Sequence, residues 1–189
     1  MPKPTMMPIT IEAVATNAAL LKATTGTQTV GVTVDPVADG VAISTATVAG
    51  SEDTAIALNV SLAERDTDGN EVIGDFCYVK LTNGATLVGG YPTVVAGDAD
   101  ASIDGTSLLG YIRVPTAAMA TLQMLPANDW HGSIDVTVAA YSVEPADNND
   151  GDNIQLDVAS FTVKVAAVAD APLLTVPVGA AGDEDTAIA

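Results

Sequence analysis

Apolar and polar positions alternate along most of the chain with a period of two. Such alternation predicts β-strands that turn one face to a core and the other to water. The pattern is clearest over 133–143 and 156–167, whereas residues 116–124 have room for only one or two helical turns. The expected inward positions of a third strand are Ile56, Leu58, Val60 and Leu62.

Turn-forming sequences such as Asn83-Gly84 and Asp104-Gly105 divide these runs into short segments. Short alternating strands separated by such turns predict an all-β fold, a seven-stranded β-sandwich. The seven expected strands lie near 40–48, at 54–63, at 72–82, twice between 86 and 125, at 133–143 and at 156–167.

Two stretches of the chain are near copies of each other. Val37-Ala38-Asp39 precedes Glu52-Asp53-Thr54-Ala55-Ile56-Ala57, and Val168-Ala169-Asp170 precedes Glu184-Asp185-Thr186-Ala187-Ile188-Ala189. The offset is 131 residues at the first block and 132 at the second, which indicates tandem domains, because solenoid repeats are shorter. We therefore expect three parts: the last strands of a preceding repeat and a linker at 1–39, a complete sandwich repeat with its linker at 40–170, and the first strand of a following repeat at 171–189.

The chain is strongly acidic, with 24 Asp and Glu against 6 Lys and Arg and a net charge of −18. A polyanion of this strength repels nucleic acid and anionic lipid and attracts cations. No apolar run reaches about 18 residues, so we expect no insertion into a membrane. The single cysteine, Cys77, lies in an apolar run and is expected to be buried and unreactive. Without a disulfide, bound metal is the usual source of rigidity in a secreted domain.

Acidic residues gather in the turns between the expected strands. The order of strands in a sandwich sorts these turns to two ends of the repeat, an upstream end where the chain arrives and a downstream end where it leaves. Ca²⁺ takes six to eight oxygen ligands, and stacked repeats would bring both ends and a linker aspartate to one junction. The candidate Ca²⁺ ligands are Glu52, Asp53, Asp129 and Asp170 downstream, and Asp39, Asp66, Asp68, Glu71 and Asp147 upstream.

Several motifs resemble those of a known family, the cadherin-like, immunoglobulin-like extender repeats of large RTX-type bacterial surface adhesins. They are the Glu52-to-Ala57 block, Asp66-Thr67-Asp68-Gly69, Pro126-Ala127-Asn128-Asp129-Trp130-His131-Gly132, and Val168-Ala169-Asp170-Ala171-Pro172. The resemblance implies a calcium-rigidified, non-enzymatic stalk that holds ligand-binding domains away from a cell surface. It also implies an extracellular location, a role in adhesion and biofilm, and neighbouring repeats of the same chain as partners.

Plainer interpretations of the same residues remain open. Asp, Asn and Gly form solvated turns without any metal. The segment from Asp66 starts like an EF-hand loop, but its twelfth position is Cys77, where glutamate is required. We expect Trp130 to plug its loop against the core and His131 to be a surface residue.

A carbohydrate-binding module is the alternative function, and an accessory domain of a secreted hydrolase is a third that rests on no particular residue. A sugar-binding surface would need a row of aromatic side chains. The candidates for such a row are Trp130, Tyr91, Tyr111 and Tyr141. No Gly-x-Ser-x-Gly, His-Glu-x-x-His or phosphate-loop motif occurs, so no enzyme is expected.

Overall fold

The protein is all-β in its computed structural model, which confirms the expected fold class. One short 3-10 helix, η1 (Thr116–Thr121), is the only helix among the described residues, and it falls where the sequence allows one or two helical turns. Besides the backbone of four N-terminal strands, the structure describes residues 37–65, 71–145, 153–175, 179 and 182–185.

The N-terminal strands form two small antiparallel pairs. β1 (Met7–Ile11) pairs with β4 (Gln28–Val32), and β2 (Val14–Thr16) pairs with β3 (Lys22–Thr24). Among the described strands, none of these four pairs with a strand that follows residue 37. The assignment of 1–39 and 171–189 to neighbouring repeats stays a prediction.

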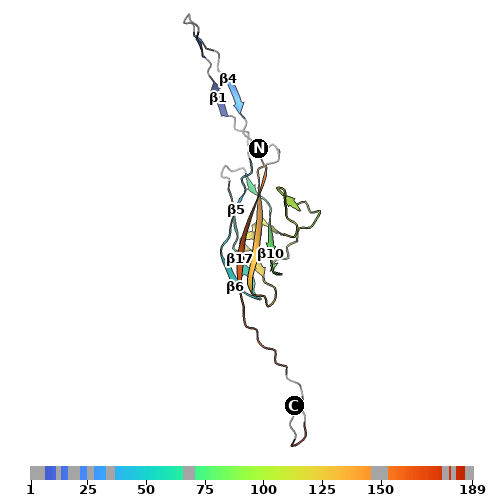
Figure 1. The fold of residues 1–189 in the computed structure, drawn as a ribbon. Coiled ribbons are helices and arrows are strands. Elements are labelled where there is room, and N and C mark those ends of the chain that lie inside the picture. Colours follow the sequence, from blue (N-terminus) through green and yellow to red (C-terminus); the bar gives the residue numbers. More distant parts are fainter. Residues whose placement is uncertain are drawn as a thin grey trace.

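The largest sheet is centred on a long antiparallel hairpin of β16 (Gly132–Val143) and β17 (Ile154–Ala166), which Figure 1 shows side by side. β6 (Val48–Ser51) runs parallel to β17 at one edge. On the other side of the hairpin, β10 (Phe76–Leu81) pairs with β16, and β14 (Ile112–Pro115) pairs with β10.

Short strands complete the fold around this sheet. Three of them form a second layer in the order β11-β15-β7, two pairs stand by themselves, and one strand extends the large sheet. These strands are β11 (Thr86–Leu87), β15 (Gln123–Leu125) and β7 (Ile56–Ala57); β5 (Val41–Ser44) with β8 (Ser61–Glu64); β12 (Ser102–Ile103) with β13 (Thr106–Ser107); and β9 (Val72–Ile73) beside β16.

The main core lies between the large sheet and the second layer, which gives the fold its β-sandwich-like character. Side chains from both layers form one buried cluster, so alternation correctly identifies the inward faces. Cys77 of β10 belongs to this cluster and is fully buried, as expected. The inward residues of β16 are Ile134, Val136, Val138 and Ala140, all completely buried.

Two of the expected strands are divided between different partners, and the strand expected at 72–82 is also interrupted, into β9 and β10, which both pair with β16. The strand expected at 40–48 splits into β5, which pairs with β8, and β6, which pairs with β17. The strand expected at 54–63 splits into β7 and β8 around Asn59, whose φ of 51° lies outside the β region. Each divided strand thereby pairs with different partners along its length.

Part of the outer face of the large sheet is also covered, although alternation predicts that this face meets water. Tyr78, Ala139 and Leu156 point to it and form a second buried cluster with Val94 and Leu108. The last two residues belong to the segment 88–111, which lies in the range 86–125 where the sequence predicts two strands. This segment folds over the part of the sheet where outward residues such as Tyr78 and Ala139 are themselves apolar.

Candidate metal centre

Three aspartates from distant parts of the chain come together at the downstream end of the repeat. Asp53 follows β6, Asp129 precedes β16, and Asp170 lies in the linker after β17. One carboxylate oxygen from each lies within 4.8 Å of the others, and all three residues are exposed. We call these residues the aspartate triad.

The backbone of two loops holds the aspartate triad in place. Asp53 and Asp129 both have positive φ, 57° and 56°, a conformation that aspartate tolerates better than most residues. The Asp129 N–H donates to Asp53 Oδ1 at 3.3 Å, and the Glu52 N–H donates to the Ala166 carbonyl at 3.1 Å. The loops that carry Asp53 and Asp129 are thus tied to each other and to the end of β17.

The chemistry of the triad suits a hard cation. Carboxylates are the oxygen ligands that Ca²⁺ prefers, and an exposed position leaves room for the water and carbonyl ligands that complete six to eight contacts. Among the residues that the structure describes, no lysine or arginine forms an ion pair with any of the three aspartates. Their negative charges therefore lack a protein counter-charge there and repel one another.

Glu52, a candidate ligand, lies apart from the aspartate triad. Its side chain is buried, with 5% exposed. Glu52 Oε1 accepts a hydrogen bond from the Val168 N–H at 2.6 Å, and Oε2 lies 3.7 Å from Nδ1 of the exposed His131. The neighbouring Asp53 points to the triad instead, and nothing in the local sequence distinguishes these two adjacent carboxylates.

At the upstream end the structure describes two of the five candidate ligands. Asp39 is exposed, whereas Glu71 is buried, with 4% exposed. Glu71 Oε1 accepts hydrogen bonds from the N–H groups of Asp39 at 2.7 Å and Gly40 at 3.0 Å. The other oxygen, Oε2, is buried and has no hydrogen-bond partner within the described part of the chain. Asp66, Asp68 and Asp147 lie outside the described residues.

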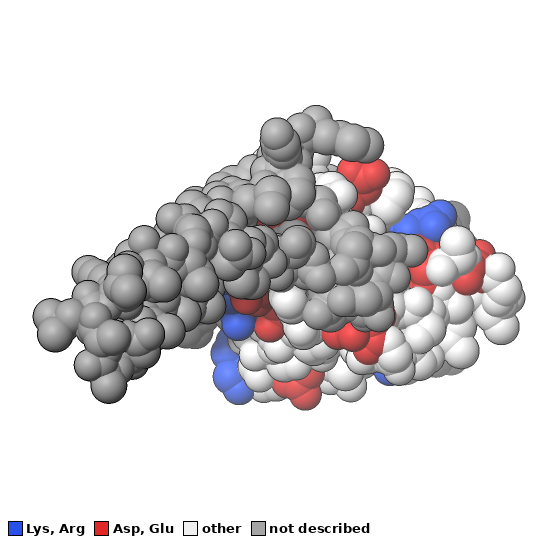
Figure 2. Space-filling view, turned by 90° about the horizontal axis from the view of Figure 1, so that it is seen from above, with Lys and Arg blue, Asp and Glu red and all other residues white. Residues whose placement is uncertain are grey.

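The acidic side chains do not gather into one patch on the face drawn in Figure 2, where they lie at several separate places with some basic side chains among them. The aspartate triad is also the only group of three or more possible metal ligands found among the described residues. The candidate metal centre of the described structure is therefore the downstream one.

The tryptophan, histidine and cysteine that were considered for other kinds of chemistry lie where packing or solvent exposure alone accounts for them. Trp130 is half-buried and packs against the main core, as expected for a loop plug, and His131 is exposed. Burial raises the pKa of the Cys77 thiol, whose Sγ lies 3.5 Å from Thr116 Oγ1. Within the described residues, the single pair of stacked or tilted aromatic rings is Tyr78 with Tyr141, on the covered face of the large sheet.

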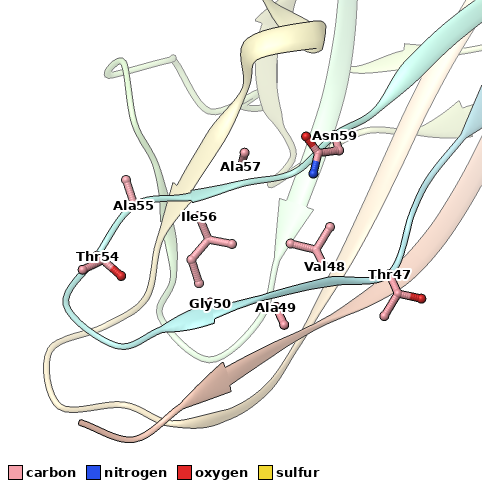
Figure 3. Close-up of a pocket in the computed structure, with 9 residues that line it drawn as sticks. All are labelled: Thr47, Val48, Ala49, Gly50, Thr54, Ala55, Ile56, Ala57 and Asn59. Carbon is pink, nitrogen blue, oxygen red and sulfur yellow. The ribbon is translucent and has the colours of Figure 1, made fainter.

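A hollow of about 300 Å³ lies between β6 and β7. Figure 3 shows that its lining consists of small and aliphatic side chains with a few hydroxyl and amide groups. No carboxylate, histidine or cysteine lines it, so it offers no group for acid–base, nucleophilic or metal chemistry. The lining residues are Thr47, Val48, Ala49, Gly50, Thr54, Ala55, Ile56, Ala57 and Asn59.

Within its described residues the chain has no helix with the length and apolar character needed to cross a membrane. Comparison with protein-family models and with curated proteins gives no match. A proposal for the function therefore rests on the residues and on the geometry of the aspartate triad.

Proposed function

We propose that the protein is a non-enzymatic extender module of a bacterial cell-surface adhesin, rigidified by Ca²⁺. The observation that carries the proposal is the aspartate triad, in which Asp170 of the linker meets Asp53 and Asp129 of the folded repeat. Two of these residues belong to loops of the sandwich, whereas the third leads towards the next repeat. A cation bound by all three would tie the linker to the body of the repeat.

The bound cation would supply charge neutralisation and fixed geometry. Asp53, Asp129 and Asp170 would hold it, because Ca²⁺ recruits carboxylates that otherwise repel one another. With Asp170 held, the linker loses freedom to rotate about its backbone, and the next repeat is carried in a restricted direction. A series of such linkers would make an extended stalk for adhesion or biofilm formation, with neighbouring repeats as its partners.

The architecture is compatible with a seven-stranded immunoglobulin-like or cadherin-like sandwich. β5 with β6 would be its first strand and β7 with β8 its second, each divided between two pairings. An extracellular location fits a domain whose lone cysteine is buried and whose charge of −18 attracts cations. The same charge disfavours nucleic acid as a partner.

The alternative, a carbohydrate-binding module, lacks a supporting observation in the described structure. Its candidate aromatics do not form a row: Trp130 packs against the main core, and Tyr141 lies in the covered second cluster. Tyr111 belongs to that cluster too and lies under the Lys80 amine, 5.5 Å from its ring centroid.

Thermal unfolding of the 189-residue chain in EDTA and in millimolar Ca²⁺ tests the proposal. A ligand that binds only the folded state stabilises it by about 2.7 kcal/mol at a hundredfold excess over its Kd. We expect a higher Tm in Ca²⁺, and we expect Asp170→Asn to remove most of the increase. Asp75→Asn, which changes an exposed carboxylate outside the triad, is the matched control. Equal Tm values in the two conditions would contradict calcium binding.

The mechanical role needs a protein with two complete repeats. Residues 1–170 followed directly by residues 40–189 provide one, because Asp170 then takes the place of Asp39. Small-angle X-ray scattering should give a larger maximum dimension in Ca²⁺ than in EDTA, and Asp170→Asn should abolish the difference. An unchanged dimension would identify the repeat as a flexible spacer rather than a rigid one.

A further inference from the structure

Buried glutamates hold the linkers at both ends of the repeat. Glu52 Oε1 accepts the Val168 N–H at 2.6 Å, and Glu71 Oε1 accepts the Asp39 N–H at 2.7 Å. The two glutamates are 5% and 4% exposed. A carboxylate is costly to bury unless N–H groups or a cation satisfy it, so both side chains depend on the linker backbone for part of their stabilisation.

The two glutamates accept hydrogen bonds from different N–H groups of the same motif. Both linkers read Val-Ala-Asp, at 37–39 and at 168–170. Glu52 binds the N–H of the valine that begins the downstream linker, and Glu71 binds the N–H of the aspartate that ends the upstream one. Because the two bonds use different donors, one linker can accept both glutamates at once. The two ends of a single repeat thus show the two sets of hydrogen bonds that one linker between two repeats could accept together.

The upstream half of the joint is reinforced beyond Glu71. The Gly40 N–H is shared between Glu71 Oε1 and Ser142 Oγ, each at 3.0 Å, and the Val41 N–H donates to Asp157 Oδ2 at 2.8 Å. Gly40 has a φ of 95°, and a Cβ at this position would overlap the Asp157 carboxylate. The chain therefore enters β5 in a conformation that glycine permits and side-chain acceptors fix.

We propose that adjacent repeats share each Val-Ala-Asp linker through a hydrogen-bonded joint that does not require the cation. In this joint, Glu52 of the repeat before the linker holds the valine N–H, and Glu71 of the repeat after it holds the aspartate N–H. The inference rests on the tandem arrangement in the proposed function. Glu52 and Glu71 are then positioning residues, and Glu52 sets the path of the linker that brings Asp170 to the aspartate triad.

Amide hydrogen exchange of the full chain in EDTA tests each half of the joint. Glu52→Ala should speed exchange of the Val168 amide by about tenfold or more, because its acceptor is lost and the linker opens locally. Glu52→Gln keeps an oxygen acceptor and should retain the protection and the Ca²⁺ affinity. Glu71→Ala and Glu71→Gln should behave likewise at the Asp39 amide. Glu64→Ala, on the exposed side of β8, is the control and should change neither amide.

Several results would overturn the joint. One is rapid exchange of the Val168 and Asp39 amides in the wild-type protein in EDTA, which would show that these hydrogen bonds depend on the cation. Another is loss of Ca²⁺ affinity in Glu52→Gln, which would make Glu52 a metal ligand. Should an alanine variant fail to fold, the wild-type and glutamine measurements still decide the question.

The fusion protein of residues 1–170 followed by 40–189 tests whether Glu52 and Glu71 both hydrogen-bond to one linker. In the natural chain Ala171 and Pro172 follow the downstream linker, and proline has no N–H, whereas the fusion restores Gly40 and Val41 there. In the linker at the fusion point, the Val168 and Asp170 amides should both be protected from hydrogen exchange in EDTA. Protection of only one amide would contradict the shared joint. If both are protected but Ca²⁺ does not change the maximum dimension, the calcium stalk fails and the joint stands.

Discussion

The segment 88–111 is fastened to the outer face of the large sheet by a hydrogen bond that a single-atom change can remove. The Tyr78 hydroxyl donates to Asp100 Oδ2 at 2.9 Å, and the Arg113 guanidinium lies 3.2 Å from the same oxygen. The other oxygen of Asp100, Oδ1, is buried without a hydrogen-bond partner among the described residues. Tyr78→Phe keeps the ring in the second cluster and leaves Asp100 with only its ion pair.

The expected loss of stability follows from the burial of these groups. A hydrogen bond to a charged group contributes about 1.5–3 kcal/mol. The upper part of that range applies here, because the Asp100 side chain is only 13% exposed and water cannot readily replace the lost donor. For a domain of this size, 1 kcal/mol corresponds to about 3–6 °C in Tm. Tyr78→Phe should therefore lower the Tm by roughly 7–18 °C.

Thermal and urea unfolding followed by circular dichroism measure this loss. Tyr141→Phe is the matched control, because it removes a hydroxyl from the other ring of the tilted pair, 6.5 Å away, for which the structure shows no hydrogen bond to Asp100. We expect it to change the Tm little. If Tyr78→Phe and Tyr141→Phe have the same effect, or if neither moves the Tm, the bond to Asp100 does not fasten the segment.

Three further outcomes are expected. Leu58→Ala should lower the free energy of unfolding by about 2–5 kcal/mol through the cavity it leaves, and Leu62→Ala by less, because Leu62 is only partly buried; equal losses would contradict this difference in burial. Cys77 should react slowly with thiol reagents in the folded protein, because it is fully buried and burial raises its pKa. Fast labelling of the folded protein would show that the assigned position of β10 is wrong. Burial also raises the pKa of both Tyr78 and Tyr141, and the bond to Asp100 raises that of Tyr78 further. Above about pH 10, the folded state therefore keeps phenol protons that the unfolded state releases, so the free energy of unfolding should be at its full value below about pH 10 and fall as the pH rises further. Chemical unfolding at a series of alkaline pH values measures this dependence. A constant free energy of unfolding above pH 10 would refute it.

Part of the site followed from the order of residues along the chain. Strand order sorts the loops to two ends, and this correctly groups Asp129 with Asp170. It does not decide between Glu52 and Asp53, because adjacent side chains point in different directions and a positive φ at Asp53 redirects the loop. The grip of Glu52 and Glu71 on the linkers left no signal in the sequence, since the acceptors bind backbone N–H groups that every non-proline residue has.

The sequence by itself determined the all-β class, the inward faces of the strands and the burial of Cys77. These properties depend on a side-chain period of two, which is local and can be read from apolar spacing. Only the tertiary structure decided how β5, β6, β7 and β8 divide their pairings, and that residues 88–111 cover the outer face of the large sheet. Alternation shows which side chains share a face, but strand partners and covering segments are chosen by long-range packing and hydrogen bonding among residues far apart in the chain.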